Sequence, residues 1–332
     1  MNIITLAHGG GGNLQNELIR QEIAPRFNNS LLASLPDGAL TAEGLVISSD
    51  SFVITPRKFP GGNIGKLAVI GTVNDILMAG GNPKYLTCSL IIEEGLELDE
   101  LREYLDSMAE TAQKCGVLIV TGDTKVVPRG AGDGLYINTT GVGFRDNRLT
   151  LDRRRIAEGD KIIVSRSMGN HGLSVLASRF DLECKNLQSD CACLAAAVES
   201  LITQTDNGKE LKFMRDATRG GVLGIISEIF EKSALSAKLY SEKFPVDAEA
   251  AAIAKMLGID PGFAACEGCL VAVAESKCAG KIVEALQKLP GGAGAAVIGE
   301  VVAGDGSVNI SSSWGALRKL VVPDGDQLPR IC

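Results

Sequence analysis

A polar and basic stretch in the middle of the chain, RDNRLTLDRRRIAEGD at residues 145–160, separates two regions with the same kind of pattern. Before it, apolar helical stripes over 65–79 and 97–115 alternate with short apolar strands that run into glycine turns. After it, the strands KIIV, CLVAVAE and AAVIGEVV and a helix over 220–231 repeat this alternation. Because 332 residues also exceed what one typical core supports, we predict an α+β protein. Its domains are expected at 1–150 and 151–320, with a flexible tail at 321–332.

The composition argues against several classes of protein. The net charge is −7 and there is no Lys/Arg stripe with interleaved aromatic residues, so we expect no nucleic-acid partner. No run of about 18 apolar residues occurs, and the N-terminal sequence does not have the pattern of a secretory signal. We therefore expect a cytoplasmic protein that does not enter a membrane. The nine cysteines are scattered over the whole length, which is typical of reduced, buried thiols rather than of a disulfide framework.

Four acidic residues stand where strands or helices meet glycine turns: Asp37 in LPDGAL, Asp50 after LVISS, Asp75 in LAVIGTVNDILMAGG and Asp123 in TGDTK. Carboxylates gathered at strand ends suit Mg²⁺, which prefers a few hard oxygen ligands together with the phosphates of a nucleotide. Each one alone is explained as well by a capping role in a turn. Only Asp75, inside an apolar helix, requires a partner.

Two glycine-rich stretches could bind a phosphate. HGGGG (8–12) offers successive backbone N–H groups, and RDATRGG places Asp216 at the start of a helix, where an anion is favoured. PGGNIGKL, which contains Lys66, lacks the spacing of a Walker A motif, so any ATP site must be of another kind. Lys125 could neutralise a transferring phosphoryl group, although a surface lysine is an equally typical explanation.

A pair of cysteines flanks a glutamate in ACEGCLVAVAE. Cys266 and Cys269, together with Cys191 and Cys193, could form a metal site or a redox pair, but the second CxxC that a zinc site needs is missing. Small buried residues are the alternative explanation. Glu267, between the two cysteines, enters a buried strand and could act as a proton acceptor.

The sequence finishes on a cysteine, Cys332, in LPRIC. A neighbouring carboxylate disfavours a thiolate, so an outside agent would have to modify this thiol. The twelve residues from Val321 could reach at most about 40 Å when extended, which is enough to enter a site elsewhere on the protein. An ordinary frayed terminus is the alternative.

These stretches together resemble the HypE family of carbamoyl dehydratases, which make the cyanide ligands of nickel–iron hydrogenases. The resemblance runs in order from about residue 5 to residue 332, through AHGGGG, SSDSFVITPRKFPGGNIGKL, TVNDILMAGG, IIEEGL, TGDTKVV, GNHG, DATRGG and PRIC. The family belongs to the superfamily of aminoimidazole ribonucleotide synthetase and selenophosphate synthetase, whose members bind ATP without a P-loop. The resemblance implies a two-domain aminoimidazole ribonucleotide synthetase-like fold, a homodimer whose N-terminal domains pair through their sheets, and an ATP cleft between the halves.

The resemblance also implies a set of site residues. Those that hold Mg²⁺ on the ATP phosphates match Asp37, Asp50, Asp75 and Asp216. Those expected to contact the nucleotide are Gly10, Gly11, Gly12, Asp50, Lys66, Asn74, Asp75, Asp123 and Asp216. The catalytic roles fall to Cys332 as the carrier, Glu267 as the base and Lys125 as the cation that stabilises phosphoryl transfer.

The implied reaction begins with a partner, HypF, which transfers a carbamoyl group to Cys332. ATP then phosphorylates the carbamoyl oxygen, and loss of phosphate and of the nitrogen-bound protons leaves a thiocyanate. Its cyanide is delivered to iron on the HypC–HypD complex. The sequence departs from the relatives in Cys266 and Cys269, which flank the Glu-Gly element, and it lacks the reactive Cys or selenocysteine of selenophosphate synthetase. Two alternatives remain: a superfamily kinase or synthetase acting on a free small molecule, and a metal-binding scaffold on the cysteines.

Overall fold

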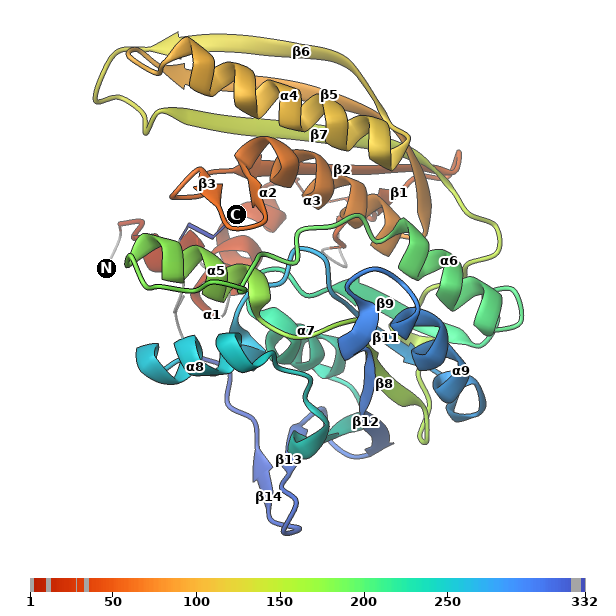
Figure 1. Cartoon of the computed structure of the whole chain (residues 1–332). Helices are drawn as coiled ribbons and strands as arrows, with labels where there is room; N and C mark the ends of the chain where they lie inside the picture. The colour runs from red at the N-terminus through yellow and green to blue at the C-terminus, as the bar shows by residue number, and fades with distance from the viewer. Residues whose placement is uncertain (1–2, 10–12, 28, 33–35, 324–329, 332) are drawn as a thin grey trace.

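The computed structural model describes residues 3–9, 13–27, 29–32, 36–323 and 330–331, and it contains one large sheet in each half of the chain (Figure 1). The first sheet has the strand order β1-β2-β7-β5-β6, in which β5 and β6 are parallel and the other neighbours antiparallel. Its strands are β1 (Ala39–Leu40), β2 (Leu45–Phe52), β5 (Gly81–Glu93), β6 (Leu118–Val127) and β7 (Leu135–Arg145). A small hairpin, β3 (Lys58–Phe59) and β4 (Gly62–Asn63), follows β2.

The second sheet has the order β14-β13-β10-β12-β8-β11-β9, and β10 with β13 is its parallel pair. Its strands are β8 (Lys161–Val164), β9 (Leu211–Asp216), β10 (Leu235–Tyr240), β11 (Leu270–Ala274), β12 (Ala296–Ala303), β13 (Val308–Ser311) and β14 (Leu317–Lys319). All five residues of β11 are buried, because helices cover both faces of this sheet. The last strand of the first sheet ends at residue 145, and the first strand of the second sheet begins at residue 161.

Helices pack around both sheets (Figure 1). They are α1 (Asn13–Leu18), α2 (Ala24–Phe27), α3 (Ile64–Met78), α4 (Leu98–Cys115), α5 (Asn170–Arg179), α6 (Ala195–Gln204), α7 (Gly221–Phe230), α8 (Ala248–Leu257) and α9 (Ser276–Gln287). The helices predicted over 65–79, 97–115 and 220–231 are confirmed as α3, α4 and α7. Within the described ranges, none of the helices combines the length and the hydrophobicity that a bilayer crossing requires.

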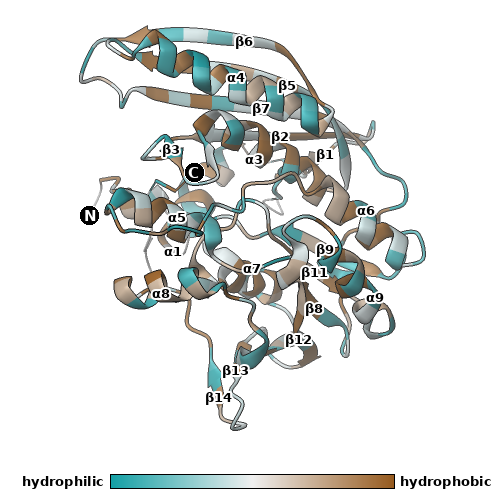
Figure 2. Cartoon of the chain, viewed as in Figure 1, coloured by the Kyte–Doolittle hydropathy of each residue, from teal (hydrophilic) through white to brown (hydrophobic). Residues whose placement is uncertain are grey.

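Helix α3 lies at the centre of the molecule and is buried almost all round. Its N-terminus is capped by Asn63, whose Oδ1 accepts a hydrogen bond of 3.0 Å from the Lys66 amide. The sequence pattern predicts one apolar stripe, but α3 packs on the first sheet with one side and on the second half of the chain with the other. Figure 2 shows α3 as mostly hydrophobic and α4, which is exposed on one side, as mixed. A helix with this burial needs apolar residues on every face.

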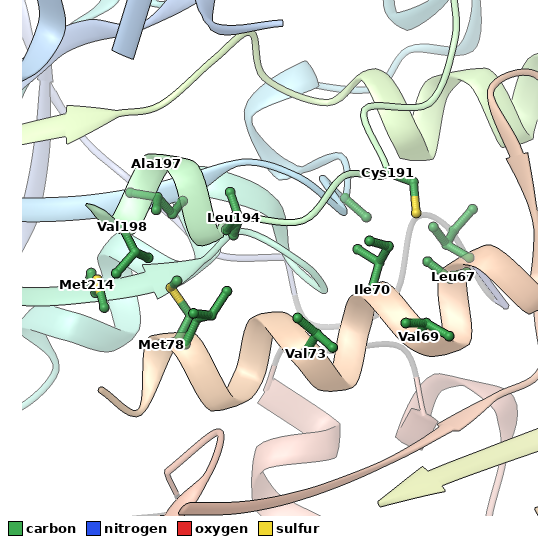
Figure 3. Close-up of a cluster of buried hydrophobic side chains, with 14 of the residues drawn as sticks. Leu67, Val69, Ile70, Val73, Met78, Cys191, Leu194, Ala197, Val198 and Met214 are labelled. Atoms are coloured by element: carbon green, nitrogen blue, oxygen red, sulfur yellow. The ribbon is translucent and has the colours of Figure 1, made fainter. Parts of the chain in front are cut away.

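The contact between the halves is apolar. In Figure 3, Leu67 and Ile70 of α3 face the loop of the second half that carries Cys191 and Leu194 and leads into helix α6. These residues belong to one core that continues from the first sheet into the second half. Burial of this apolar area holds the halves in a fixed relation. Polar groups at their junction are therefore held in fixed positions as well.

Candidate active site between the two halves

The hydroxyl group of Ser48 lies between two acidic residues of the first half, the carboxylate of Asp75 and the backbone carbonyl group of Asp37. Its Oγ lies 2.7 Å from Asp75 Oδ2 and 2.9 Å from the carbonyl oxygen of Asp37, and it donates its hydrogen to one of these acceptors at a time. Asp50 lies two residues further along β2, on the sheet face that packs against α3. The partner that the sequence requires for Asp75 is therefore Ser48.

The second half contributes Asp216, the last residue of β9. Its side chain is 3% exposed, and Oδ2 has no hydrogen-bond partner. The preceding residue, Arg215, crosses to the first half, where its Nη2 lies 2.6 Å from Asp37 Oδ1. Asp37, Asp50, Asp75 and Asp216, which the sequence places far apart, thus belong to one cluster at the junction of the halves.

The cluster contains more negative charge than its surroundings compensate. Burial, and next the charge of Asp37, raise the pKa of Asp216 to about 8. Burial, and next the charge of Asp216, raise the pKa of Asp75 well above its ordinary value. Burial also raises the pKa of Asp50, and the positive charge of Arg219 opposes this shift. Such raised pKa values are expected where carboxylates are assembled for a cation.

The cluster fits an ion that brings some of its own ligands. Within the part of the chain that the structure describes, no three His, Cys, Asp or Glu side chains are placed to hold a metal ion alone. Mg²⁺ usually binds one or two carboxylates and takes its other ligands from phosphates and water. The buried, partnerless Oδ2 of Asp216 is a free ligand of this kind. The residues therefore fit Mg²⁺ in company with a nucleotide phosphate.

Glu267 lies beside this cluster, in the turn before β11. It is 3% exposed, and its Oε1 is a second buried oxygen without a hydrogen-bond partner. Burial, and next the charge of Asp216, raise the pKa of its carboxyl well above the ordinary range. A carboxylate with a raised pKa is a stronger base once it is ionised. The position and the chemistry both suit the proton acceptor that the sequence suggests.

The cysteines around Glu267 serve as packing groups. Cys266 and Cys269 are completely buried, and the Gly169 amide donates a hydrogen bond of 3.0 Å to Cys266 Sγ. The eight cysteines that the structure describes are unpaired, but only four of them are buried as the sequence predicts, namely Cys191, Cys266, Cys269 and Cys278. No cysteine cluster among the described residues is arranged to hold a metal ion. The structure thus gives no support to a metal-binding scaffold.

Lys125 and Asp123 lie on the other face of the first sheet. Lys125 Nζ is 2.5 Å from Asp123 Oδ2, and both side chains are exposed on the edge strand β6. The register joins Asp123 to Ser89, Asn138 and Ser51, whereas Asp50 belongs to the neighbouring row. Because successive residues of a strand point to opposite faces, one chain does not bring this pair to its own carboxylate cluster.

Two other predicted nucleotide contacts bind the protein itself. The Asn74 side chain donates to the carbonyl oxygen of Ala192 at 3.2 Å and accepts from the Leu194 amide at 2.9 Å. Lys66 Nζ donates to the carbonyl oxygen of Gly61 at 2.8 Å. Gly10, Gly11, Gly12 and Cys332 lie outside the described residues. The neighbour of those glycines, Gly9, has its carbonyl oxygen 3.4 Å from Arg219 Nη1.

The residues just before Cys332 are seated between the two halves. Arg330 forms an ion pair with Asp133 and donates to the carbonyl oxygen of Val53 at 2.9 Å. Its own carbonyl oxygen accepts from Arg179 at 3.0 Å and from the Thr55 amide at 3.2 Å. These contacts hold the chain against the segment that follows β2, the strand that carries the carboxylate Asp50.

Ile331 is held by a buried histidine. Ile331 is 3% exposed, and its carbonyl oxygen lies 2.9 Å from His171 Nε2. His171 Nδ1 lies 2.8 Å from Ser189 Oγ, and the ring packs edge-on against Phe59 at 5.2 Å. Burial lowers the pKa of His171 to about 4. The ring is therefore neutral at pH 7, with Nε2–H donating to Ile331 and Nδ1 accepting from Ser189.

We expect the stability of the protein to depend on the protonation of His171. Its pKa is lower in the folded chain than in the unfolded chain, so stability is complete above pH 6.5 and falls as the pH drops toward about 4. The loss is roughly 3 kcal/mol. Urea unfolding should show a destabilised His171→Gln variant at pH 7 and a much smaller gap to the wild type at pH 4. A gap of equal size at both pH values contradicts the assignment, and His8→Gln, at a partly buried position away from Ile331, is the control.

Sequence reasoning did not identify several residues of this site. Four charged residues lie close to the carboxylates or to the segment before Cys332: Arg215, Arg219, Asp133 and Arg179. In addition, the Asp190 carboxylate accepts a hydrogen bond from the Glu267 amide. Arg215 and Arg219 stand in RDATRGG, so their proximity to Asp216 was a usable signal. The others contact partners that are distant in the sequence, and no local pattern marks them.

Comparison with known proteins agrees with this architecture. Residues 36–144 match the family described as AIR synthase related protein, N-terminal domain, and residues 157–311 match the corresponding C-terminal domain. The carbamoyl dehydratase HypE of Escherichia coli (strain K12) is 41% identical over 341 residues, which cover 100% of both chains. HypE of Rhizobium leguminosarum bv. viciae is 41% identical over 334 residues, covering 99% of this chain and 95% of that protein.

The chain belongs to the HypE family. Among solved structures, a HypE–HypF complex matches with a TM-score of 0.87 and 38% identity over 92% of this chain and 99% of that one. HypE in complex with ATP matches with a TM-score of 0.82 and 39% identity over 99% of this chain and 100% of that one. The predicted family, fold class and two-domain α+β architecture are confirmed.

A solved structure with much lower sequence identity has the same fold. Thiamine monophosphate kinase from Aquifex aeolicus is 16% identical, with a TM-score of 0.67 over 93% of this chain and 97% of that one. At that identity the likeness is one of fold alone. The full-length agreement with the HypE family therefore favours the dehydratase prediction over the alternative of a kinase for a free small molecule.

Proposed function

We propose that this protein is an ATP-dependent carbamoyl dehydratase whose substrate group is carried on its own Cys332. The observation that supports this most directly is the position of Arg330 and Ile331. Ile331 contacts His171, His171 contacts Ser189, and the next residue, Asp190, contacts the Glu267 backbone. The residue before the carrier thiol is thus three contacts from the candidate base, at the junction that also holds the carboxylates.

The reaction balances without an oxidant or a reductant. The carbamoyl oxygen attacks the γ-phosphorus of ATP, ADP leaves, and a base takes one proton from the nitrogen. The C–O bond then breaks, phosphate leaves with the oxygen, and the nitrogen loses its second proton. The products are a thiocyanate on sulfur, ADP, phosphate and protons, so the carbamoyl group loses the elements of one water while ATP is converted to ADP and phosphate.

Named residues of the chain have defined roles in this scheme. Glu267 accepts a nitrogen-bound proton, since its carboxylate is buried, unpartnered and of raised pKa. Asp37, Asp50, Asp75 and Asp216 would hold Mg²⁺, and the ion would neutralise phosphate charge during the transfer. A reduced thiol as the carrier fits a cytoplasmic setting. HypF as carbamoyl donor and the HypC–HypD complex as cyanide acceptor complete the proposal.

We further propose that Asp123 and Lys125 act across a homodimer. They project from the exposed face of the first sheet, away from the carboxylates of their own chain. The same face carries an apolar row, Ile47, Val142, Tyr85 and Leu118, joined by the strand register. Leu118 is 64% exposed and Tyr85 is 43% exposed. An exposed apolar row with a polar border is typical of a protein interface.

A charge in this row should break the dimer. We expect Leu118→Asp to weaken dimer affinity on the order of 100-fold, because the interface must then bury an unpaired carboxylate from each subunit. Analytical ultracentrifugation over a concentration series measures the effect. Met256→Asp, on α8 and 68% exposed, is the matched control and should leave the dimer intact. A dimer unchanged by Leu118→Asp argues against pairing through this face.

The proposal is tested by the dependence of ATP turnover on Cys332. With HypF, carbamoyl phosphate and MgATP, the wild type should release ADP in step with carbamoylation, and Cys332→Ala should release none above background. A kinase for a free small molecule predicts equal turnover by both proteins once its substrate is supplied. Equal ADP release by the two proteins in the HypF system would therefore refute the dehydratase.

A further inference from the structure

The backbone of the candidate base is held from both sides. On the amide side, the Glu267 and Gly268 N–H groups donate to the two oxygens of one carboxylate, Asp190 Oδ1 at 3.1 Å and Oδ2 at 3.2 Å. Each carboxylate oxygen of Asp190 therefore accepts a hydrogen bond from a different backbone amide. Asp190 comes from the loop before α6, far from Glu267 in the sequence, and its side chain is 9% exposed.

On the carbonyl side, the same peptide meets the other half of the protein. The carbonyl oxygen of Glu267 accepts from the Ala192 amide and from Asn74 Nδ2, each at 3.4 Å. Asn74 is a residue of α3, the helix that also carries Asp75. The backbone of Glu267 is thus fixed to the loop at 190–192 and to the helix that holds part of the carboxylate cluster.

The turn has no room to relax. A Cβ at Gly268 would lie 2.0 Å from the carbonyl oxygen of Asp190, so only glycine lets the loop approach this closely. That same carbonyl oxygen accepts a hydrogen bond of 3.0 Å from Arg166. The hydrogen bond from Arg166 therefore holds the loop in place independently of Glu267. Because the loop is held, its hydrogen bonds to the Glu267 and Gly268 amides fix the backbone of Glu267 as well.

The side chain of Glu267 has no comparable support of its own. Its Oε1 is buried without a hydrogen-bond partner, so its direction follows from the conformation of the backbone that carries it. A buried carboxylate at position 190 is unfavourable unless hydrogen bonds satisfy both oxygens. The two adjacent amides meet that need, and an uncharged amide side chain at this position would offer one acceptor where two donors converge.

We infer that Asp190 is a positioning residue for Glu267: its carboxylate fixes the Glu267–Gly268 peptide and so keeps the base aimed into the site. The inference rests on the proposed dehydration. Asp190 acts through Glu267 and touches neither the carbamoyl group nor the nucleotide. Nucleotide binding and carbamoyl transfer to Cys332 therefore do not depend on it, whereas the proton-transfer step does.

The first test is the kinetics of Asp190→Asn. We expect kcat for loss of water to fall on the order of 100-fold, with KM for ATP and the rate of carbamoylation unchanged, since misplacement of a catalytic group by about 1 Å has this effect. Rates are taken per carbamoylated Cys332, so only folded chains count. Asp190→Ser, which keeps one oxygen acceptor, replaces the Asn variant if that variant yields no folded protein. Asp160→Asn is the control, because Asp160 is 5% exposed and accepts a backbone hydrogen bond of 2.9 Å in a turn outside the site.

The second test is a double-mutant cycle with Glu267→Gln. If Asp190 acts through Glu267, the double variant should be as slow as Glu267→Gln alone. Multiplying losses would show an independent effect and overturn the inference, as would an Asp190→Asn protein with wild-type kcat. Absence of water loss in the wild type would instead refute the proposed function, so the two failures are distinguishable.

Discussion

Glu267→Gln should stop the loss of water from the carbamoylated protein while HypF still carbamoylates Cys332. The amide has nearly the shape of the carboxyl group but cannot take a proton from the substrate nitrogen. Removal of a general base commonly lowers kcat by about 10²- to 10⁴-fold, and the burial of Glu267 at 3% exposure leaves little access for a substitute base from solvent. Rapid-quench measurement of thiocyanate formation determines the effect.

A matched change nearby separates this effect from a general disturbance. Glu275, just after β11, pairs with Lys212 at 2.7 Å outside the site, and Glu275→Gln should stay within about twofold of the wild-type rate. Retention of more than a tenth of the wild-type kcat by Glu267→Gln would assign the proton transfer to another group.

Asp216→Asn should strongly slow phosphoryl transfer and yet stabilise the metal-free protein. Asp216 is a buried carboxylate with a partnerless oxygen, and we expect its loss to lower kcat by roughly 10³-fold if that oxygen holds Mg²⁺. Its pKa is raised to about 8 in the folded chain. The stability linked to this group is therefore complete below about pH 4 and is lost as the pH rises through 8.

The neutral asparagine avoids that loss, so the metal-free variant should melt at a higher temperature than the wild type at pH 8. In the presence of a non-hydrolysable ATP analogue, which supplies the phosphate ligands, addition of Mg²⁺ should raise the melting temperature of the wild type and leave that of Asp216→Asn unchanged. Asp146→Asn is the contrasting control. Asp146 is also buried, but Arg148 lowers its pKa, so its neutralisation should destabilise the protein without changing the response to Mg²⁺. A wild type whose melting temperature does not respond to Mg²⁺ while the ATP analogue is present contradicts the assignment of the cluster.

Much of the fold follows from local pattern. Strand ends, glycine turns and helical stripes place α3, α4 and α7 within one residue of their observed ends, because these signals lie within each segment. The burial of α3 on all sides does not follow from such a pattern. It arises because the second half of the chain covers the side of the helix that the first sheet leaves free, and that contact joins residues far apart in the sequence.

The site residues likewise fall into two groups, those marked by a local sequence pattern and those whose partners are distant in the sequence. Asp50, Asp75 and Asp216 are marked by their places at strand ends or inside an apolar helix, so the sequence reveals them singly and the fold brings them together. Asp190 is invisible to that reasoning, since its partners are amides 77 and 78 residues away. The seat of Ile331 on His171, 160 residues away, is equally non-local.

The central claim is that the oxygen of a carbamoyl group on Cys332 leaves as phosphate. The most direct measurement uses HypF and carbamoyl phosphate with heavy oxygen in the carbamoyl group, followed by MgATP and mass spectrometry of both the C-terminal peptide and the released phosphate. We predict a peptide that first gains one carbamoyl group and then loses one water, with the heavy oxygen recovered in inorganic phosphate. Heavy oxygen in bulk water, or an adduct on any residue other than Cys332, would contradict the account.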